Sequence, residues 1–239
     1  MILITGASSG LGAALAKCYH NDNQQVIISG RNTTRLDAIR QGLGANICAI
    51  TADLTSAASV SALFDQVELV QQTQQAQLTL LTQQAQLRLH TVIHCAGSGY
   101  FGAIETQRPE AISELLQNNI MSAILLVRET VKRYKDQAVN VVVVMSTAAL
   151  SAKAGESSYC AAKWAVRGFI ESVRLELKGS PMKIIAVYPG GMDTDFWPTS
   201  GKTIDTSCFM SADDAANMLK QALVSSQHGY VADITINRA

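Results

Sequence analysis

The chain opens with a short apolar run that leads straight into a glycine-rich turn. Residues 1–12 read MILITGASSGLG, and the AALAK that follows is typical of a helix. Glycines let the backbone turn tightly and approach a pyrophosphate, whose charge then meets the helix N-terminus. The spacing Gly-x-x-x-Gly-x-Gly differs from the standard dinucleotide fingerprint, and small-residue turns are common between a strand and a helix. The opening therefore indicates a phosphate site.

Apolar runs alternate with helical patterns along the rest of the chain. After the first run, we expect strands at 26–29, 47–51, 91–94, 139–145, 183–188 and 230–236, and helices that include 112–134 and 157–177. Buried parallel strands read as near-continuous apolar runs, as these do. The sequence therefore predicts an α/β fold: a doubly wound, Rossmann-like parallel sheet with helices on both faces. A ligand would cross the carboxyl ends of its strands.

Length and composition favour one enzyme-sized domain over residues 1–239. Of its residues 48% are hydrophobic and the formal net charge is zero, so nothing points to nucleic acid or an acidic membrane surface. No signal peptide or membrane span is visible, and the five cysteines are scattered without metal-like pairs. We therefore expect a cytoplasmic protein with reduced thiols and no metal.

Tyr159 and Lys163 lie four residues apart in the second helical pattern, with Ser146 thirteen residues before the tyrosine. Residues at this spacing share one face of a helix. A tyrosine hydroxyl titrates near ~10 in water, and a neighbouring cation pulls that pKa toward neutrality. Such a phenol can exchange protons at working pH. The alternative for the pair alone is a solvated helix face.

These motifs together resemble the short-chain dehydrogenase/reductase family over nearly the whole chain. The family's turn matches Thr5, Gly6, Gly10 and Gly12, and its Tyr-x-x-x-Lys pair matches Tyr159 and Lys163. Its serine matches Ser146, its helix asparagine matches Asn119, and its Pro-Gly turn with a following threonine matches Pro189, Gly190 and Thr194. Five motifs occur in the family's order.

The resemblance implies hydride transfer between a nicotinamide and a carbonyl or alcohol carbon of a small-molecule substrate. Tyr159 would act as general acid in reduction and as base in oxidation. Lys163 would lower the tyrosine pKa and bind the nicotinamide ribose, and Ser146 would hold the substrate oxygen. Asn119 would position a water that links Lys163 to bulk solvent.

The same resemblance implies a cofactor site along the strand ends. Its expected residues are Gly6, Ser8, Ser9, Gly10, Leu11, Gly12, Arg31, Asp53, Leu54, Cys95, Ala96, Gly97, Tyr159, Lys163, Pro189, Gly190 and Thr194. The second predicted strand ends without the carboxylate that usually binds the ribose of NAD, and Arg31 follows it. Because an arginine can hold a 2′-phosphate, we expect NADP(H), with NAD(H) as the alternative.

Two positions in this site leave a choice open. Asp53 matches the family residue near the adenine ring, but it is equally suited to cap the next helix. Cys95 stands where the family commonly has an asparagine that braces the sheet. We expect altered stability or cofactor fit from that exchange, without loss of activity.

The substrate would be chosen by a lid at about 192–211 and by residues after Gly97. These segments contain Tyr100, Phe101, Phe196, Trp197, Phe209 and Met210. The residues would form an apolar pocket for a small or medium carbonyl compound, or they would pack only against the lid's own underside.

A tandem near-repeat, TQQAQLTLL followed by TQQAQLRLH, occupies residues 73–90. We interpret it as a local duplication that lengthens the helix before the fourth strand. The alternative is a glutamine-rich interaction element.

Other activities and the assembly state remain to be distinguished. A non-catalytic NADP-binding regulator on the same fold would typically lose the tyrosine or the lysine, and this chain keeps both. A lyase or epimerase is the other alternative. The resemblance also implies a homodimer or homotetramer formed through the helices at 112–134 and 157–177. Trp164, Phe169 and Val173 would then belong to an outer apolar face or to the core.

Overall fold

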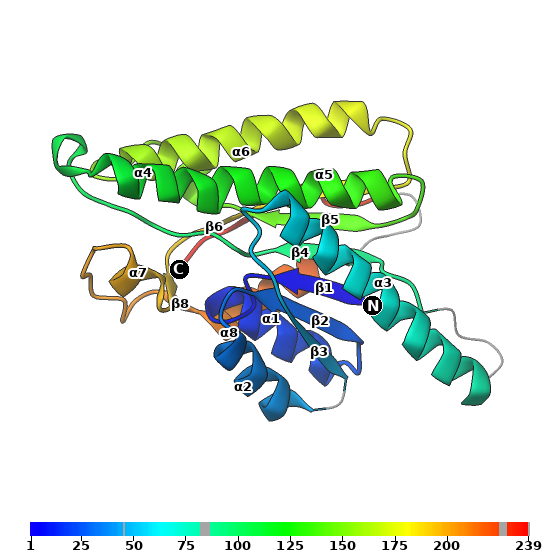
Figure 1. The fold of residues 1–239 in the computed structure, drawn as a ribbon. Coiled ribbons are helices and arrows are strands. Elements are labelled where there is room, and N and C mark those ends of the chain that lie inside the picture. Colours follow the sequence, from blue (N-terminus) through cyan, green and yellow to red (C-terminus); the bar gives the residue numbers. More distant parts are fainter. Residues whose placement is uncertain (45, 82–86, 225–228, 239) are drawn as a thin grey trace.

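The computed structural model describes residues 1–44, 46–81, 87–224 and 229–238, with side chains except at 77–81. Its seven parallel strands form one sheet in the order β3-β2-β1-β4-β5-β6-β9 (Figure 1). Their bounds are β1 Ile2–Thr5, β2 Val26–Gly30, β3 Ile47–Thr51, β4 Thr91–His94, β5 Asn140–Val144, β6 Lys183–Pro189 and β9 Asp233–Ile236. The predicted doubly wound parallel sheet is therefore confirmed.

Helices cover both faces of the sheet (Figure 1). One face carries α3 (Ala57–Leu81), α4 (Pro109–Leu116), α5 (Ser122–Tyr134) and α6 (Ser157–Glu176). The opposite face carries α1 (Gly10–Asn21), α2 (Thr33–Leu43) and α8 (Ala212–Ala222). The short helix α7 (Phe196–Thr199) lies at the carboxyl edge, between the two-residue strands β7 (Met192–Asp193) and β8 (Met210–Ser211), which pair with each other.

The core consists of two layers because successive strand residues face opposite sides. In β1, Leu3 packs with the α3 and α5 side, whereas Ile2 and Ile4 pack with the α1 and α8 side. In β5, Val141 and Val143 likewise face the first layer. Apolar side chains at every position of a strand are therefore buried, which explains the continuous runs in the sequence.

The observed elements correct several predicted boundaries. The fifth strand ends at Val144, one residue before the predicted limit, and the last strand begins at Asp233 because its pairing with β6 starts there. The helical pattern at 112–134 contains a π-helical turn, Gln117–Met121, between α4 and α5. The predicted strand at 47–51 and the one at 91–94 match the structure at both ends.

Helix α3 extends through the first copy of the near-repeat, to Leu81. The second copy begins at residue 82, and residues 82–86 lie outside the described part of the chain. Residues 87–90 are not helical and lead into β4. The observed helix therefore includes the first copy, and the origin and role of the duplication remain predictions.

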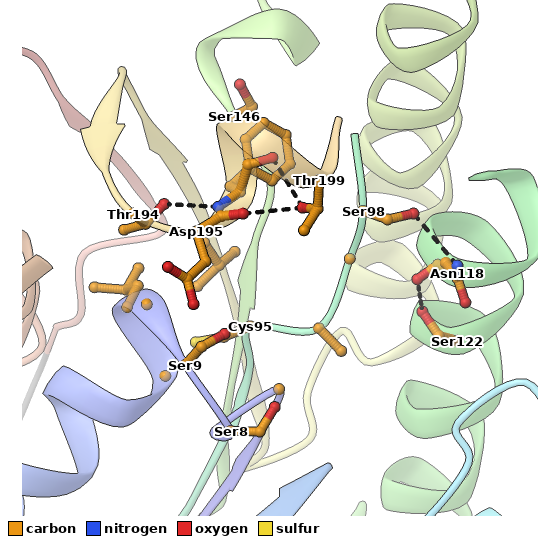
Figure 2. A pocket seen from close by; sticks show the side chains of 18 of the residues that line it. Ser8, Ser9, Cys95, Ser98, Asn118, Ser122, Ser146, Thr194, Asp195 and Thr199 are labelled. Atoms are coloured by element: carbon orange, nitrogen blue, oxygen red, sulfur yellow. Dashed lines mark hydrogen bonds between the residues drawn. The ribbon is translucent and has the colours of Figure 1, made fainter. Parts of the chain in front are cut away.

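The carboxyl ends of the strands bring the predicted site residues together. Ser8 and Ser9 follow β1, Cys95 follows β4, and Ser146 follows β5. Figure 2 shows these side chains around one pocket, with Thr194 and Asp195 approaching from the segment after β6. The sheet therefore sets the position of the site, and the loops supply its side chains.

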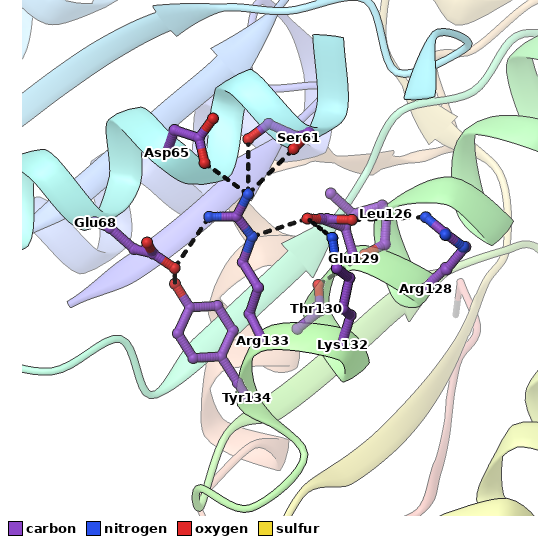
Figure 3. A network of polar contacts seen from close by, with 10 residues as sticks. All are labelled: Ser61, Asp65, Glu68, Leu126, Arg128, Glu129, Thr130, Lys132, Arg133 and Tyr134. Atoms are coloured by element: carbon purple, nitrogen blue, oxygen red, sulfur yellow. Dashed lines mark hydrogen bonds and ion pairs between the residues drawn. The ribbon is translucent and has the colours of Figure 1, made fainter. Parts of the chain in front are cut away.

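A network of charges joins α5 to α3 on the outside of the first layer (Figure 3). Glu129 has a side chain only 4% exposed, and Arg133 Nε donates to its Oε1 at 2.9 Å. The same guanidinium contacts Asp65 at 2.7 Å and Glu68 at 3.1 Å. Burial opposes ionisation of Glu129, but the Arg133 hydrogen bond and the nearby cations outweigh it and lower the pKa of this carboxyl.

We expect Arg133→Met to lower the free energy of unfolding by about 2–4 kcal/mol, because it leaves the buried Glu129 carboxylate with weaker partners. Chemical denaturation at pH 7 measures this loss. Arg128→Met is the matched control, since its guanidinium is 63% exposed and lies 3.7 Å from Glu129; it should cost less than about 1 kcal/mol. Equal losses in the two variants would contradict a specific role for the α3–α5 network.

Candidate active site

The glycine turn after β1 is pressed against the end of β4. Gly6 has a φ of +70°, and a Cβ there would lie 2.4 Å from the backbone nitrogen of Ala96. A Cβ at Gly12 would lie 2.4 Å from the carbonyl oxygen of Gly6. Larger residues at either position would force the turn open. Glycine therefore allows α1 to begin directly beside the strand ends.

The first turn of α1 faces the pocket without a side-chain cap. Its N-cap residue, Ser9, makes no capping hydrogen bond, although serine commonly does so. Gly10, Leu11 and Gly12 line the pocket. Uncapped N–H groups at a helix N-terminus, together with the helix dipole, suit an anionic group such as a phosphate.

A cleft of about 550 Å³ runs along the carboxyl edge of the sheet. One end lies beside Arg31 and Asp53, which follow β2 and β3, and the other lies beside Tyr159 and Phe196. Its size falls within the range of small-molecule and cofactor sites.

Tyr159 and Lys163 share one face of α6, as their spacing predicts. Both residues are only 6% exposed, and Lys163 Nζ lies 5.5 Å from the centre of the Tyr159 ring. The Ser146 hydroxyl acts to lower the pKa of the phenol, and Ser146 Oγ accepts from Ala148 N at 3.1 Å. The predicted trio therefore converges at one end of the cleft.

Burial is the largest influence on the pKa values of Tyr159 and Lys163. It raises the pKa of Tyr159, although the nearby Ser146 hydroxyl acts in the opposite direction. Burial also lowers the pKa of Lys163 to about 8, because a desolvated ammonium is disfavoured. In the protein alone, the phenol is therefore neutral at pH 7. The lowering of the tyrosine pKa by Lys163 remains a prediction.

Asn119 lies behind the cleft, on the π-helical turn between α4 and α5. Its Nδ2 donates to the carbonyl oxygens of Ser98 and Leu115, each at 2.9 Å. Its Oδ1 is buried, with no hydrogen-bond partner among the described residues. A Cβ at Gly97 would lie 2.7 Å from this oxygen and 3.3 Å from Lys163 Nζ. Asn119 Oδ1 and Lys163 Nζ thus both lie beside Gly97. The Asn119 oxygen is an acceptor that still requires a hydrogen-bond donor.

Two arginines approach the opposite end of the cleft. Arg31, directly after β2, donates from Nη1 to Asn118 Oδ1 at 3.2 Å. Arg35, in the first turn of α2, pairs with Asp195 at 3.4 Å. The sequence analysis singled out Arg31 and missed Arg35. The sequence signal for Arg35 was its place four residues after Arg31.

Asp53 lines the cleft and does not cap α3. Its Oδ1 accepts from the backbone nitrogen of Thr55 at 3.0 Å and from its hydroxyl at 2.8 Å. These hydrogen bonds lower the pKa of the carboxyl. Helix α3 begins at Ala57, and the hydroxyl of Ser56 accepts from Ser59 N at 3.3 Å. The alternative interpretation of Asp53 as a helix cap is therefore wrong.

Cys95 follows β4 at the centre of the cleft. Burial raises the pKa of its thiol to about 12, so the thiol is neutral at pH 7. The Cys95 side chain packs against the α1 side of the core.

Thr194 lies close to the glycine turn, because a Cβ at Gly10 would lie 3.6 Å from its Cγ2. Pro189 and Gly190 line the cleft between them.

Comparison with known proteins identifies the family. A family model described as short chain dehydrogenase matches residues 1–205. This chain belongs to the short-chain dehydrogenase/reductase family. A crystal structure of a short-chain dehydrogenase/reductase from Vibrio parahaemolyticus is 50% identical, with 100% of both chains covered and a TM-score of 0.84.

Two further relatives are also oxidoreductases by name. A putative family oxidoreductase from Aeromonas hydrophila is 33% identical over 100% of this chain and 98% of that one, with a TM-score of 0.76. The 3-oxoacyl-(acyl-carrier-protein) reductase of Rickettsia bellii is 26% identical over 98% of this chain and 93% of that protein.

The structure of this family member brings nearly all the predicted site residues to one cleft. Asn119 is the exception among them: it does not line the cleft but lies behind Gly97. Arg35, Asn118 and Glu156 are among the lining residues that the sequence analysis missed. Asn118 links Arg31 to Ser98, to which its Nδ2 donates at 3.3 Å (Figure 2).

Aromatic residues from two segments of the chain line the cleft near Tyr159. The Phe101 ring lies 5.3 Å from the Tyr159 ring, and the Phe196 ring lies 5.8 Å from it. Phe101, Phe196 and Trp197 line the cleft. In contrast, Phe209 packs behind Trp197 at 5.4 Å. Phe101, Phe196 and Trp197 are thus placed to contact a ligand, whereas Phe209 packs against the lid segment itself; a substrate pocket remains a prediction.

Proposed function

We propose that this chain is an NADP(H)-dependent oxidoreductase that interconverts a carbonyl and a secondary alcohol, with Tyr159 as general acid and base. One observation carries the proposal. Ser146 and the buried side chains of Tyr159 and Lys163 line one cleft together with a glycine turn and an uncapped helix N-terminus. The family membership supports the class of reaction.

The residues of the cleft fit a dinucleotide. Gly6 and Gly12 keep the turn free of side chains, and the N–H groups of α1 would hold the pyrophosphate. Thr194 and the backbone at Pro189 and Gly190 would bind the nicotinamide amide, and Lys163 would bind its ribose. When bound, the nicotinamide supplies or accepts the hydride.

The side chains of the trio would manage the proton and the substrate oxygen. In reduction, Ser146 donates a hydrogen bond to the carbonyl oxygen, and Tyr159 gives its proton to that oxygen as negative charge develops. Its raised pKa keeps the phenol protonated for this task. Lys163 and a water held by the orphaned Asn119 Oδ1 would then return a proton to Tyr159 from solvent.

The 2′-phosphate of NADP would bind between Arg31 and Arg35. Strand β2 ends at Gly30 without a carboxylate to repel it. Both arginines line the cleft, and both guanidinium groups are exposed enough to turn toward a ligand. Charge-assisted hydrogen bonds from arginine to phosphate are strong and geometrically specific.

Residues 192–211 would form a lid over the substrate. The pairing of β7 with β8 fixes both ends of this segment, and the backbone nitrogen of Phe101 donates to Ser200 O at 3.1 Å. Phe101, Phe196 and Trp197 would form the wall of a pocket for a small or medium carbonyl compound.

A panel of aldehydes, ketones and keto acids, each with NADPH and NADH, tests the proposal. We expect NADPH-dependent reduction of at least one apolar or aromatic carbonyl, because the pocket wall is aromatic. Cofactor consumption measured by absorbance is the readout, with protein lacking added substrate as the control. NADPH binding without turnover of any carbonyl or alcohol would favour the regulatory alternative.

Assembly and cellular location remain proposals. Among the candidates for an outer apolar face, Trp164 is 48% exposed on α6, whereas Val173 is buried in the core. A homodimer or homotetramer through the helices at 112–134 and 157–177 would cover Trp164. Within the described part of the chain, no helix is long and apolar enough to cross a membrane. We propose a cytoplasmic location.

A further inference from the structure

A buried carboxylate stands at the substrate end of the cleft. Glu156 immediately precedes α6, three residues before Tyr159, so that the two side chains lie on the same side of the helix start. Its side chain is 9% exposed, and it lines the cleft. The proposed proton transfer does not use it. A buried carboxylate that lacks a catalytic task requires a partner, because an unpaired buried charge is costly.

The partner of Glu156 comes from the segment proposed as the lid. Lys202 Nζ lies 3.4 Å from Glu156 Oε1, and its side chain is 41% exposed. Across the described residues, it is the only cation within ion-pair distance of this carboxylate. Lys153, another cation of the cleft, donates instead to Thr147 Oγ1 at 3.1 Å.

The ammonium of Lys202 also contacts the aromatic wall. Its Nζ lies 5.6 Å from the centre of the Phe101 ring, within the range of cation–π interactions. The space between the Glu156 carboxylate and the Phe101 ring therefore accepts a cation. Glu156 and Phe101 both line the cleft, and the Phe101 ring lies 5.3 Å from the Tyr159 ring.

The two members of the pair are not equivalent. Glu156 is held at the start of a long helix and is shielded from water, whereas Lys202 is half-exposed and can return its ammonium to solvent at little cost. When the Lys202 ammonium moves into water, the buried Glu156 carboxylate requires another cation. The solvated ammonium of Lys202 requires no other anion. The asymmetry favours a cationic substrate group over an anionic one.

We propose that Glu156 is a specificity-determining residue that binds a protonated amine of the substrate, so that the substrate is an amino alcohol or the corresponding amino ketone. In the protein alone, the ammonium of Lys202 takes the place of that amine, and the substrate displaces it. The inference rests on the proposed function for the reaction, but its claim about recognition can be tested by binding alone.

Three alcohols of nearly equal size separate the charge of the substrate from its shape: 2-amino-1-phenylethanol (cation), 1-phenyl-1-propanol (neutral) and mandelate (anion). With saturating NADPH, an alcohol binds without reacting, and titration followed by tryptophan fluorescence gives its dissociation constant. We expect the wild type to bind the amino alcohol at least about tenfold more tightly than the other two, because a charge-assisted hydrogen bond in a buried site is strong.

Three variants assign this preference to its source. Glu156→Gln should abolish the preference for the amino alcohol, and Lys202→Met should tighten its binding several-fold, because the competing ammonium is gone. Glu114→Gln is the matched control, since Glu114 is an exposed carboxylate of the same cleft. It should leave the preference within about twofold of the wild type, because exposed charges are screened by water.

Several results would overturn the inference. One is that the amino alcohol does not bind. Another is that the wild type binds mandelate more tightly and that Lys202→Met removes this preference. A third is that Glu156→Gln weakens the binding of all three alcohols equally, because the Glu156–Lys202 pair would then only hold the lid. Turnover of the three alcohols with NADP⁺ is measured separately. If the protein prefers the amino alcohol in binding but oxidises none of the alcohols, the proposed reaction is wrong and the recognition site stands. If it oxidises the neutral alcohol but shows no preference for the amino alcohol, the reaction stands and the recognition site is wrong.

Discussion

Tyr159→Phe should lower kcat/KM for carbonyl reduction about 10²–10⁴-fold, the usual contribution of a positioned general acid. The variant removes one hydroxyl from a ring that is only 6% exposed and packs edge-on against Phe101. Because the ring and its packing are kept, the fold should survive. Steady-state kinetics with NADPH and the best carbonyl of the panel measures the loss, and fluorescence titration measures cofactor affinity, which should remain within about threefold of the wild type.

Tyr230→Phe is the matched control, because it removes the same hydroxyl from a residue that is 40% exposed and remote from the cleft. Its activity should equal that of the wild type. Undiminished reduction by Tyr159→Phe would remove the assigned acid, and with it the proposed mechanism. Loss of both turnover and NADPH binding would instead indicate a structural role for the phenol.

The sequence predicted the site well where spacing along the chain determines geometry. Four residues on a helix place Tyr159 beside Lys163, and a glycine turn between a strand and a helix places Gly6 and Gly12 at the sheet edge. Strand ends in a parallel sheet meet at one edge, so Ser146 joins them. None of these positions requires knowledge of distant contacts.

Spacing alone was insufficient where irregular local backbone, or a contact with a distant segment, decides where a side chain lies. The π-helical turn that directs Asn119 behind Gly97 interrupts a helical pattern that looks continuous in the sequence. Asp53 suits a helix cap by residue type, but the hydroxyl of Ser56 lies closer to the helix start and takes that place. Glu156 was overlooked because its partner, Lys202, lies 46 residues away.

The pair Arg31 and Arg35 shows how both kinds of information combine. Arg31 was identified from its place after β2, whereas Arg35 required the structure, which places both in the same cleft. If both contact the 2′-phosphate, Arg31→Ala with Arg35→Ala should weaken NADPH binding about 10²–10³-fold, because each charged hydrogen bond contributes about 1.5–3 kcal/mol and neighbouring effects are not fully additive. NADH, which lacks the phosphate, should bind as before within about threefold.

The single variants separate phosphate binding from other roles of these side chains. Arg35 also pairs with Asp195, so Asp195→Asn is the matched control: it breaks the ion pair but keeps the guanidinium. We expect it to change NADPH and NADH affinity by similar, small factors, because both side chains of that pair are more than half exposed. If the double arginine variant weakens both cofactors equally, the arginines shape the cleft without binding the phosphate, and the preference for NADP must come from elsewhere. A selective loss for NADPH that is larger in the double variant than in either single variant would place the phosphate between the two guanidinium groups.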